Sequence, residues 1–185
     1  MGGRGWDYGF DIAVDSSGNT YVTGSSPSSW GSPVRAYTAE SDAFVAKLDS
    51  SGNLIWNTFL GGSGSDGGNG VTVDRSGNVY VAGQSSAAYI SGQINATWGS
   101  PVGVYTVGGF VAKLTNDGNL AWNTFLGGND WVTGQDIAVA GSGDVYVAGD
   151  SFVAWGNAVR AFTVVKKRLD RDKRRSQISD SSPKY

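Results

Sequence analysis

Hydrophobic and polar residues alternate along short stretches of this chain, and clusters of Gly, Asn, Ser and Asp separate these stretches. Phe44, Ala46 and Leu48 fall on one face of an extended segment, and residues 54–60 alternate in the same way. A period of two residues is typical of β-strands. Between them lies Asp-Ser-Ser-Gly-Asn, a composition that favours a turn closed by a glycine with positive φ. We therefore predict β-hairpins, and before the last twenty residues no window has a helical period.

Three blocks of sequence recur in a fixed order, which is the strongest signal in the chain. The first block, IAVDSSGNTYVTG, occupies residues 12–24 and returns in related form at 71–83 and 137–149. The second, WGSPVRAYT, begins at Trp30 and returns at Trp98 and Trp155. The third, AFVAKLDSSGNLIWNTFLGG, covers residues 43–62 and returns at 109–128. The first and third blocks each read as a hairpin, so one unit supplies four strands.

A repeated four-stranded antiparallel sheet is typical of a β-propeller blade. We predict an all-β chain that forms a partial β-propeller of about three blades. The third blade is incomplete, because no copy of the AFVAKL block follows Thr163. The predicted boundaries are 1–62 for the first blade, 63–128 for the second, 129–165 for the partial third, and 166–185 for a basic, disordered tail.

The ordered blocks IAVDSSGNTYVTG, WGSPVRAYT and DAFVAKLDSSGNLIWNTFLGG resemble the SBBP repeat, a bacterial β-propeller repeat family, over residues 1 to about 165. The resemblance implies a secreted or cell-surface protein that serves in binding or display, and it implies no catalytic residues. The N-terminus MGGRGWDYGF lacks the basic and apolar regions of a signal peptide. An extracellular or cell-surface location is therefore an expectation from the resemblance alone.

Composition narrows the chemistry that the chain can carry. It has no cysteine and no histidine, which excludes disulfides, thiolate metal sites and histidine-dependent nucleophilic catalysis. No apolar run approaches the roughly 18 residues of a membrane span, so we expect no membrane insertion. Residues 166–185 hold 8 Lys/Arg against 3 Asp, while the rest of the chain holds 6 Lys/Arg against 13 Asp/Glu. The basic tail lacks interleaved aromatic residues, so we expect a solvated terminus and no nucleic-acid partner.

The repeated Trp-Gly loops contain the candidate ligand-binding residues, which are Trp30, Arg35, Trp98, Trp155 and Arg160. Exposed tryptophans in these loops would stack on sugar rings, and the arginines would pair with a carboxylate or a phosphate. Alternatively, each tryptophan packs between neighbouring blades. Recurrence in every unit favours packing, because what repeats in a propeller is usually what each unit needs for its own core.

Acidic residues offer two further candidates, and we expect neither to form a site. The Asp of the D-x-S-G-N turns either caps the turn or binds calcium, but a calcium ion needs six to eight oxygens. Asp7 with Asp11, or Asp130 with Asp136, would suit glycoside hydrolysis only if the fold brought them together. We predict no catalytic residue, no cofactor and no metal.

The leading interpretation is a non-catalytic β-propeller fragment that acts as an extracellular interaction or scaffold module. A carbohydrate-binding module that uses the Trp-Gly loops is the alternative, and a fragment of a propeller enzyme such as a glycosidase is a third. The expected partners are a protein or glycan ligand, together with further blades or a second copy of the chain.

Overall fold

The computed structural model describes residues 2–86, 89–90, 93–94, 98–102, 108–126 and 131–151. All regular elements in these ranges are β-strands. The strands of the first unit are β1 (Tyr8–Val14), β2 (Thr20–Ser26), β3 (Asp42–Leu48) and β4 (Leu54–Leu60). The second unit has β5 (Asp66–Val73), β6 (Val79–Ser85), β7 (Tyr89–Ile90), β8 (Gln93–Ile94), β9 (Gly108–Leu114) and β10 (Leu120–Leu126). The third has β11 (Val132–Val139) and β12 (Val145–Ser151).

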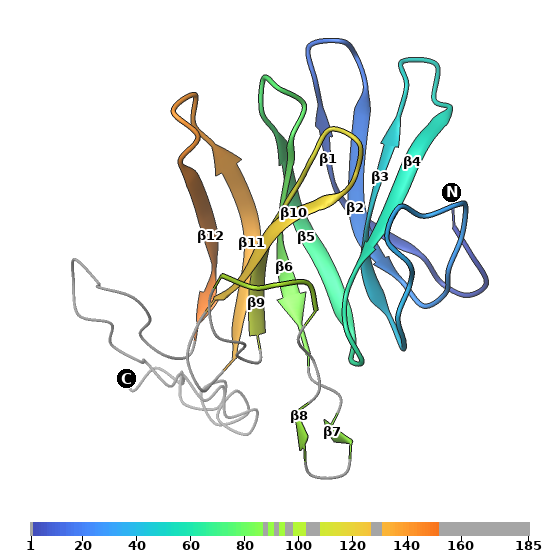
Figure 1. Cartoon of the computed structure of the whole chain (residues 1–185), viewed down its shortest axis with the longest axis vertical. Coiled ribbons are helices and arrows are strands. Elements are labelled where there is room, and N and C mark those ends of the chain that lie inside the picture. The colour runs from blue at the N-terminus through green and yellow to red at the C-terminus, as the bar shows by residue number, and fades with distance from the viewer. Residues whose placement is uncertain are drawn as a thin grey trace, which may run out of the picture.

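Each full unit folds into one antiparallel four-stranded sheet, with order β1-β2-β3-β4 in blade 1 and β5-β6-β9-β10 in blade 2 (Figure 1). Blade 3 contributes the pair β11-β12 to the described residues. The prediction of an all-β partial propeller with an incomplete third blade is confirmed. The small hairpin β7-β8 was not predicted. It lies where Trp98 follows Gly83 by fifteen positions, whereas Trp30 follows Gly24 by six positions in blade 1.

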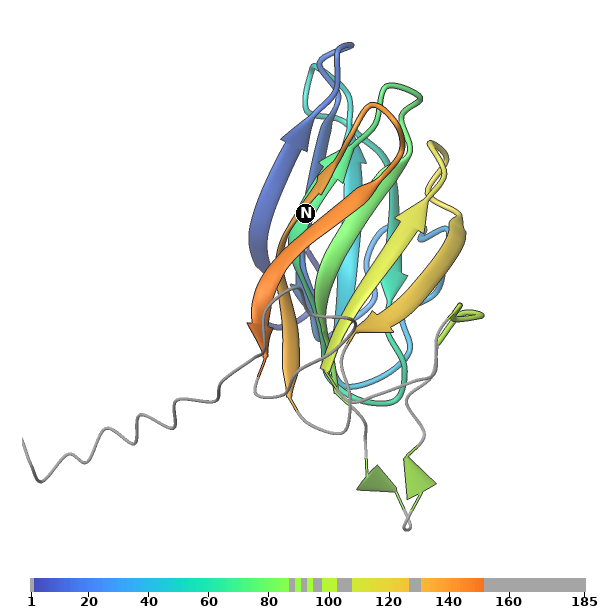
Figure 2. The same ribbon diagram turned by 90° about the vertical axis from the view of Figure 1, so that its left-hand side faces the viewer.

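The three sheets lie side by side (Figures 1 and 2). The first strands of neighbouring units contact one another, β1 with β5 and β5 with β11. Strand β5 packs against β1 and β2, and β11 packs against β5 and β6. The largest apolar cluster lies between blades 1 and 2 and includes Tyr21, Val45, Trp56, Val71, Val81 and Phe110. A second cluster joins Tyr80 and Val111 of blade 2 to Ile137 of blade 3. Burial between blades is therefore what holds the units together.

No helix among the described residues is both long and apolar enough to cross a membrane.

The turns of the five hairpins that build the three blade sheets gather at one end of these sheets (Figures 1 and 2). Each turn contains a glycine with positive φ, as the sequence predicted: 81° at Gly18, 83° at Gly52, 78° at Gly77, 81° at Gly118 and 91° at Gly143. Glycine is favoured at these positions because a Cβ opposes this backbone conformation. Two of them, Gly52 and Gly118, occupy equivalent turns but differ in their surroundings. A Cβ on Gly118 would lie 2.9 Å from the Trp56 ring of blade 1, whereas nothing lies within 4 Å of a Cβ on Gly52.

This difference leads to a prediction about two matched alanine variants. Gly52→Ala is expected to lower the free energy of unfolding by about 1 kcal/mol, which is the backbone cost alone. Gly118→Ala is expected to cost about 2–3 kcal/mol, because the methyl group also collides with Trp56 across the blade junction. Urea unfolding followed by circular dichroism measures both. Equal losses in the two variants would show that Trp56 does not pack on the Gly118 turn.

Candidate functional site

The Trp-Gly loops of blades 1 and 2, as far as the structure describes them, follow the outer edges of their blades. In blade 1, Val34 N donates to Asn57 O at 2.8 Å and Phe59 N donates to Arg35 O at 3.1 Å, so the loop adds backbone hydrogen bonds along β4. In blade 2, Val102 N donates to Asn123 O at 2.8 Å in the same way. The loops thus cover strand edges that would otherwise present unpaired backbone groups.

An asparagine of the WNTFL segment anchors the loop in each of blades 1 and 2. Asn57 Nδ2 donates to Trp30 O at 2.8 Å, and Asn123 Nδ2 donates to Trp98 O at 2.9 Å. The next residue in each loop, Gly31 or Gly99, has a φ of 66° or 70°. A Cβ on either glycine would lie within 2.7 Å of the asparagine Oδ1. The Trp-Gly pair and the distant asparagine therefore form one structural unit.

The two described loop tryptophans are part of the core. Trp30 meets Phe59 edge-on with ring centroids 5.9 Å apart, and Trp98 meets Phe125 edge-on at 5.8 Å. Trp30 is 8% exposed and Trp98 is 3% exposed. Stacking on a sugar needs an open ring face, so the sugar-stacking interpretation does not fit these two side chains. Trp155 and Arg160 lie outside the described residues.

Arg35 points into the junction between blades 1 and 2. Its guanidinium donates to Phe59 O at 2.8 Å and to Gly61 O at 3.0 Å, and it lies 5.8 Å from the centre of the Trp98 ring. Burial lowers the pKa of Arg35, an effect that Asp42 and Asp66 oppose. The carboxylates that this arginine faces thus belong to the chain itself.

Asp42 and Asp66 form a buried acidic pair at this junction. They are 0% and 3% exposed, and one oxygen of each has no hydrogen-bond partner. A Cβ on Gly61 would collide with both carboxylates, so the two carboxylates lie beside the same space, which only a glycine leaves free. Burial raises the pKa of Asp66 to about 7, against the effects of hydrogen bonds from Ser85 and Gly62. Burial also raises the pKa of Asp42, which a hydrogen bond from Thr38 opposes.

In the turns after β1 and β5, both carboxylate oxygens of the aspartate accept hydrogen bonds from nearby residues of the same hairpin. Asp15 Oδ1 accepts from Ser17 N at 2.8 Å and from Asn19 N at 3.0 Å, and its Oδ2 accepts from Asn19 Nδ2 and Tyr21 Oη. Asp74 accepts an equivalent set of hydrogen bonds in blade 2. Burial acts to raise the pKa of Asp15, but these hydrogen bonds outweigh it and the pKa is lowered. The geometry is that of a turn cap. In the described ranges no group of three or more acidic side chains is placed to hold a metal ion.

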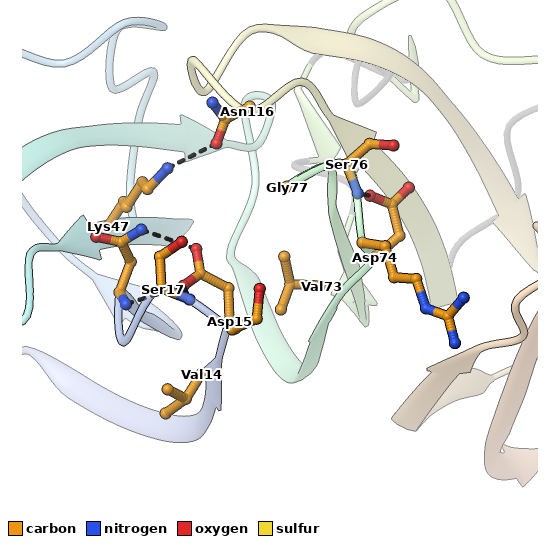
Figure 3. A pocket seen from close by; sticks show the side chains of 12 residues that line it. Val14, Asp15, Ser17, Lys47, Val73, Asp74, Ser76, Gly77 and Asn116 are labelled. Carbon is orange, nitrogen blue, oxygen red and sulfur yellow. Dashed lines mark hydrogen bonds between the residues drawn. The ribbon is translucent and has the colours of Figure 1, made fainter.

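A polar cleft of about 370 Å³ opens between the turns of blades 1 and 2 (Figure 3). The turn after β1 forms one wall and the turn after β5 the other. Lys47 and Asn116 close its side, with Lys47 Nζ donating to Asn116 Oδ1 at 2.6 Å. The exposed side chain of Arg75 also lines the cleft. The cleft residues come from β3, from the ends of β1 and β5 with the turns after them, and from the turn after β9. They lie together only because blades 1 and 2 pack against each other.

The SBBP family model, described as a β-propeller repeat, matches residues 2–29 and 55–90. The chain contains an SBBP repeat segment. The first match runs from the N-terminal loop through β1 and β2, and the second runs from β4 through β5 and β6 to β7. No curated protein matches the chain.

Among the acidic residues considered for glycoside hydrolysis, Asp11 links two blades, while Asp7 and Asp136 accept hydrogen bonds from nearby residues of the chain. Asp11 Oδ2 accepts from Val71 N at 2.8 Å across the first junction, and Asp7 Oδ2 accepts from Gly3 N at 2.9 Å. Asp136 Oδ1 accepts from the backbone N of Ile137 at 2.8 Å. Asp130 lies outside the described residues. The structure therefore gives Asp11 a packing role between two SBBP units.

Sequence reasoning did not predict two features of the junction between blades 1 and 2. The cleft residues Lys47 and Asn116 are 69 positions apart and belong to different blades. The buried charges did leave a signal in the sequence. At the equivalent positions one unit later, Arg35, Asp42 and Asp66 are replaced together by Gly103, Gly108 and Val132. Joint replacement of three charged residues indicates that they form one cluster.

Proposed function

We propose that this SBBP repeat segment is a non-catalytic interaction or scaffold module that binds a partner through the turn end of its blades. The polar cleft between the turns of blades 1 and 2 carries the proposal. Loops on a rigid scaffold are where binding residues tend to lie, and strand pairing fixes these turns firmly. Arg75 and the serines of the two turns present hydrogen-bonding groups to solvent there. An extracellular or cell-surface location is part of the proposal and rests on the resemblance to the family.

A glycan array and a displayed random-peptide library are the probes for this proposal, because they separate a glycan partner from a protein partner. Binders are retested against Arg75→Ala, which removes an exposed cleft side chain. We expect affinity to fall about tenfold or more, as for the loss of one charge-assisted hydrogen bond. Arg4→Ala is the matched control, because Arg4 is also exposed but precedes β1 at the opposite end of that strand.

Binding that Arg75→Ala leaves unchanged would move the contact away from the turn cleft. Turnover of a polysaccharide by the wild-type chain, lost in Asp11→Asn, would replace the non-catalytic proposal by the glycosidase alternative. Antibody labelling of intact cells of the source organism tests the location separately.

A further inference from the structure

Lys47 is a buried cation in the wall of the turn cleft. It is 7% exposed and lines the cleft between blades 1 and 2 (Figure 3). On the central strand β3 it lies directly opposite Tyr21 of β2 and Trp56 of β4, which are both buried. Its ammonium nitrogen is 5.2 Å from the centre of the Tyr21 ring. These aromatic neighbours pack against the aliphatic stem of the lysine and so fix the position of its charge at the cleft.

This ammonium group has no carboxylate partner among the described residues. Its one hydrogen bond is to Asn116 Oδ1, an uncharged acceptor, at 2.6 Å. An ammonium has three N–H donors, so two of them remain. Lysine is almost never buried this far without a counter-charge, because removing an unpaired charge from water is costly. A bound carboxylate would give Lys47 the counter-charge that the described residues do not supply.

The other groups with spare hydrogen-bonding capacity at the cleft are also donors. Asn116 Nδ2 and the Arg75 guanidinium make no hydrogen bond within the described residues. The carboxylates of Asp15 and Asp74, in contrast, accept hydrogen bonds at both oxygens from their own hairpins. The cleft therefore offers donors, and a ligand that fits it must bring acceptors.

The charges of the cleft favour an anion with a single negative charge. Two cationic side chains, Lys47 and Arg75, and two anionic ones, Asp15 and Asp74, line it. One carboxylate would neutralise the buried ammonium. A phosphate group carries a charge of about −1.5 to −2 at neutral pH, so it would leave excess negative charge beside the two aspartates. The electrostatics thus favour a carboxylate over a phosphate.

The apolar lining of the cleft favours an amino-acid side chain over an acidic sugar. Its apolar members are Val14 and Val73, and no aromatic residue is among the described residues that line it. Tyr21, which lies nearest, is 0% exposed and has the Lys47 ammonium over its ring, so it has no open face on which a sugar could stack. The two valines suit the methylene groups of aspartate or glutamate.

We propose that the turn cleft binds an acidic side chain of a partner protein, whose carboxylate pairs with Lys47 Nζ and accepts further hydrogen bonds from Asn116 Nδ2 and Arg75. The inference rests on the proposed function and adds the chemistry of the ligand to it. All residues that line the cleft belong to blades 1 and 2, whose four-stranded sheets are both described. Because Lys47 comes from one blade and Asn116 from the other, only the packed pair of blades makes the site.

Three variants isolate the role of the buried charge. Lys47→Met removes the charge but keeps a long stem to pack on Tyr21. Asn116→Asp supplies a carboxylate from the chain itself, at an exposed turn position 2.6 Å from Lys47 Nζ. Lys113→Met is the matched control, because Lys113 lies over the Tyr80 ring at 5.1 Å in the same way but does not line the cleft. Circular dichroism verifies that each variant is folded.

The stability of Asn116→Asp gives a test without any ligand. We expect its urea unfolding midpoint to exceed that of the wild type, because the new carboxylate pairs with a buried ammonium that has no other counter-charge. A midpoint that is unchanged or lower would show that Lys47 gains nothing from a carboxylate at this position, and the inference would fail.

Peptides selected from the displayed random-peptide library test the binding itself. Those whose binding needs Arg75 are made in pairs, one with its acidic residue and one with the corresponding amide, and isothermal titration calorimetry gives both Kd values. In the wild type and Lys113→Met, the amide is expected to bind about tenfold or more weakly, as for the loss of a charge-assisted hydrogen bond. In Lys47→Met and Asn116→Asp, the two peptides should bind equally, because the pairing of ligand and Lys47 is lost.

The failure of this inference can be distinguished from the failure of the proposed function. Cleft-binding peptides that contain no acidic residue, or an acid preference that survives in Lys47→Met and Asn116→Asp, would overturn the inference and leave the proposed function standing. A library that yields no peptide sensitive to Arg75→Ala would overturn both. Binding of acidic glycans alone, abolished in Asn116→Asp, would show that the carboxylate belongs to a sugar and would overturn the assignment to a protein partner.

Discussion

Replacing Trp98 by alanine is expected to lower the free energy of unfolding by about 3–5 kcal/mol, the range for deletion of a large aromatic side chain from a core. Trp98 is 3% exposed and belongs to the cluster between blades 1 and 2. Its ring meets Phe110 and Phe125 edge-on, and its Nε1 donates to Ser85 Oγ at 3.3 Å. Deletion therefore removes packing within blade 2 and weakens the contact with blade 1. Urea unfolding followed by circular dichroism provides the measurement.

Two further variants make this result interpretable. Trp6→Ala removes a tryptophan that is 80% exposed, so we expect a change below about 0.5 kcal/mol. Trp98→Phe keeps an aromatic ring but loses the indole hydrogen bond and some volume, so its loss should lie between the other two. A Trp98→Ala variant that unfolds at the wild-type urea concentration, but loses binding on a glycan array, would instead support the sugar-stacking interpretation of the Trp-Gly loops.

The repeat made most of the fold predictable. Alternation in segments such as residues 44–48 identifies strands, and recurrence of the same blocks one unit later identifies which hairpins belong to one sheet. The turn glycines were predictable for a local reason, because positive φ depends on the glycine itself and its immediate neighbours. These features need only contacts that are short in sequence or repeated along it.

The roles of the site residues were less predictable, because they depend on contacts between distant segments. The sequence left open whether Trp30 is core or exposed, and the deciding contact is with Asn57, 27 residues away. Arg35 was considered as a ligand-binding residue, but its guanidinium meets Phe59 O, Gly61 O and the buried carboxylates of its own junction. The hairpin β7-β8 lies in a stretch that has no counterpart in blade 1, so repetition gave no information about it.

The buried acidic pair makes the first junction electrostatically different from the second. Arg35 lies near Asp42 and Asp66, but within the described residues its guanidinium hydrogen-bonds only to backbone carbonyls. At the second junction, which lies between blades 2 and 3, Gly108 and Val132 replace the two acids. Val132 is 2% exposed and lies next to Gly108. Because a buried carboxylate with an unpartnered oxygen is costly when ionised, only the first junction is expected to respond to pH near neutrality.

The free energy of unfolding is therefore expected to fall by about 2 kcal/mol as the pH rises from 5 to 7. The pKa of Asp66 in the folded chain is about 7, above its usual value of 3.8. Between these two values the folded chain keeps a proton that the unfolded chain has already lost. The contribution of protonated Asp66 to the free energy of unfolding is therefore complete below pH 3.8. It declines as the pH rises from this value to the folded pKa, and it is lost above the folded pKa. The raised pKa of Asp42 acts in the same direction.

Urea unfolding at pH 5, 6 and 7 measures this slope, and the composition keeps the measurement simple. The chain has no histidine and no cysteine, so no side chain with an ordinary pKa titrates in this window. Asp66→Asn should flatten the curve, because the amide keeps an oxygen that accepts from Gly62 N but carries no charge. Asp117→Asn, at an exposed turn residue, should reproduce the wild-type slope. If wild type and Asp66→Asn lose stability in parallel, Asp66 is not the group that holds the proton, and the acidic pair does not control the junction.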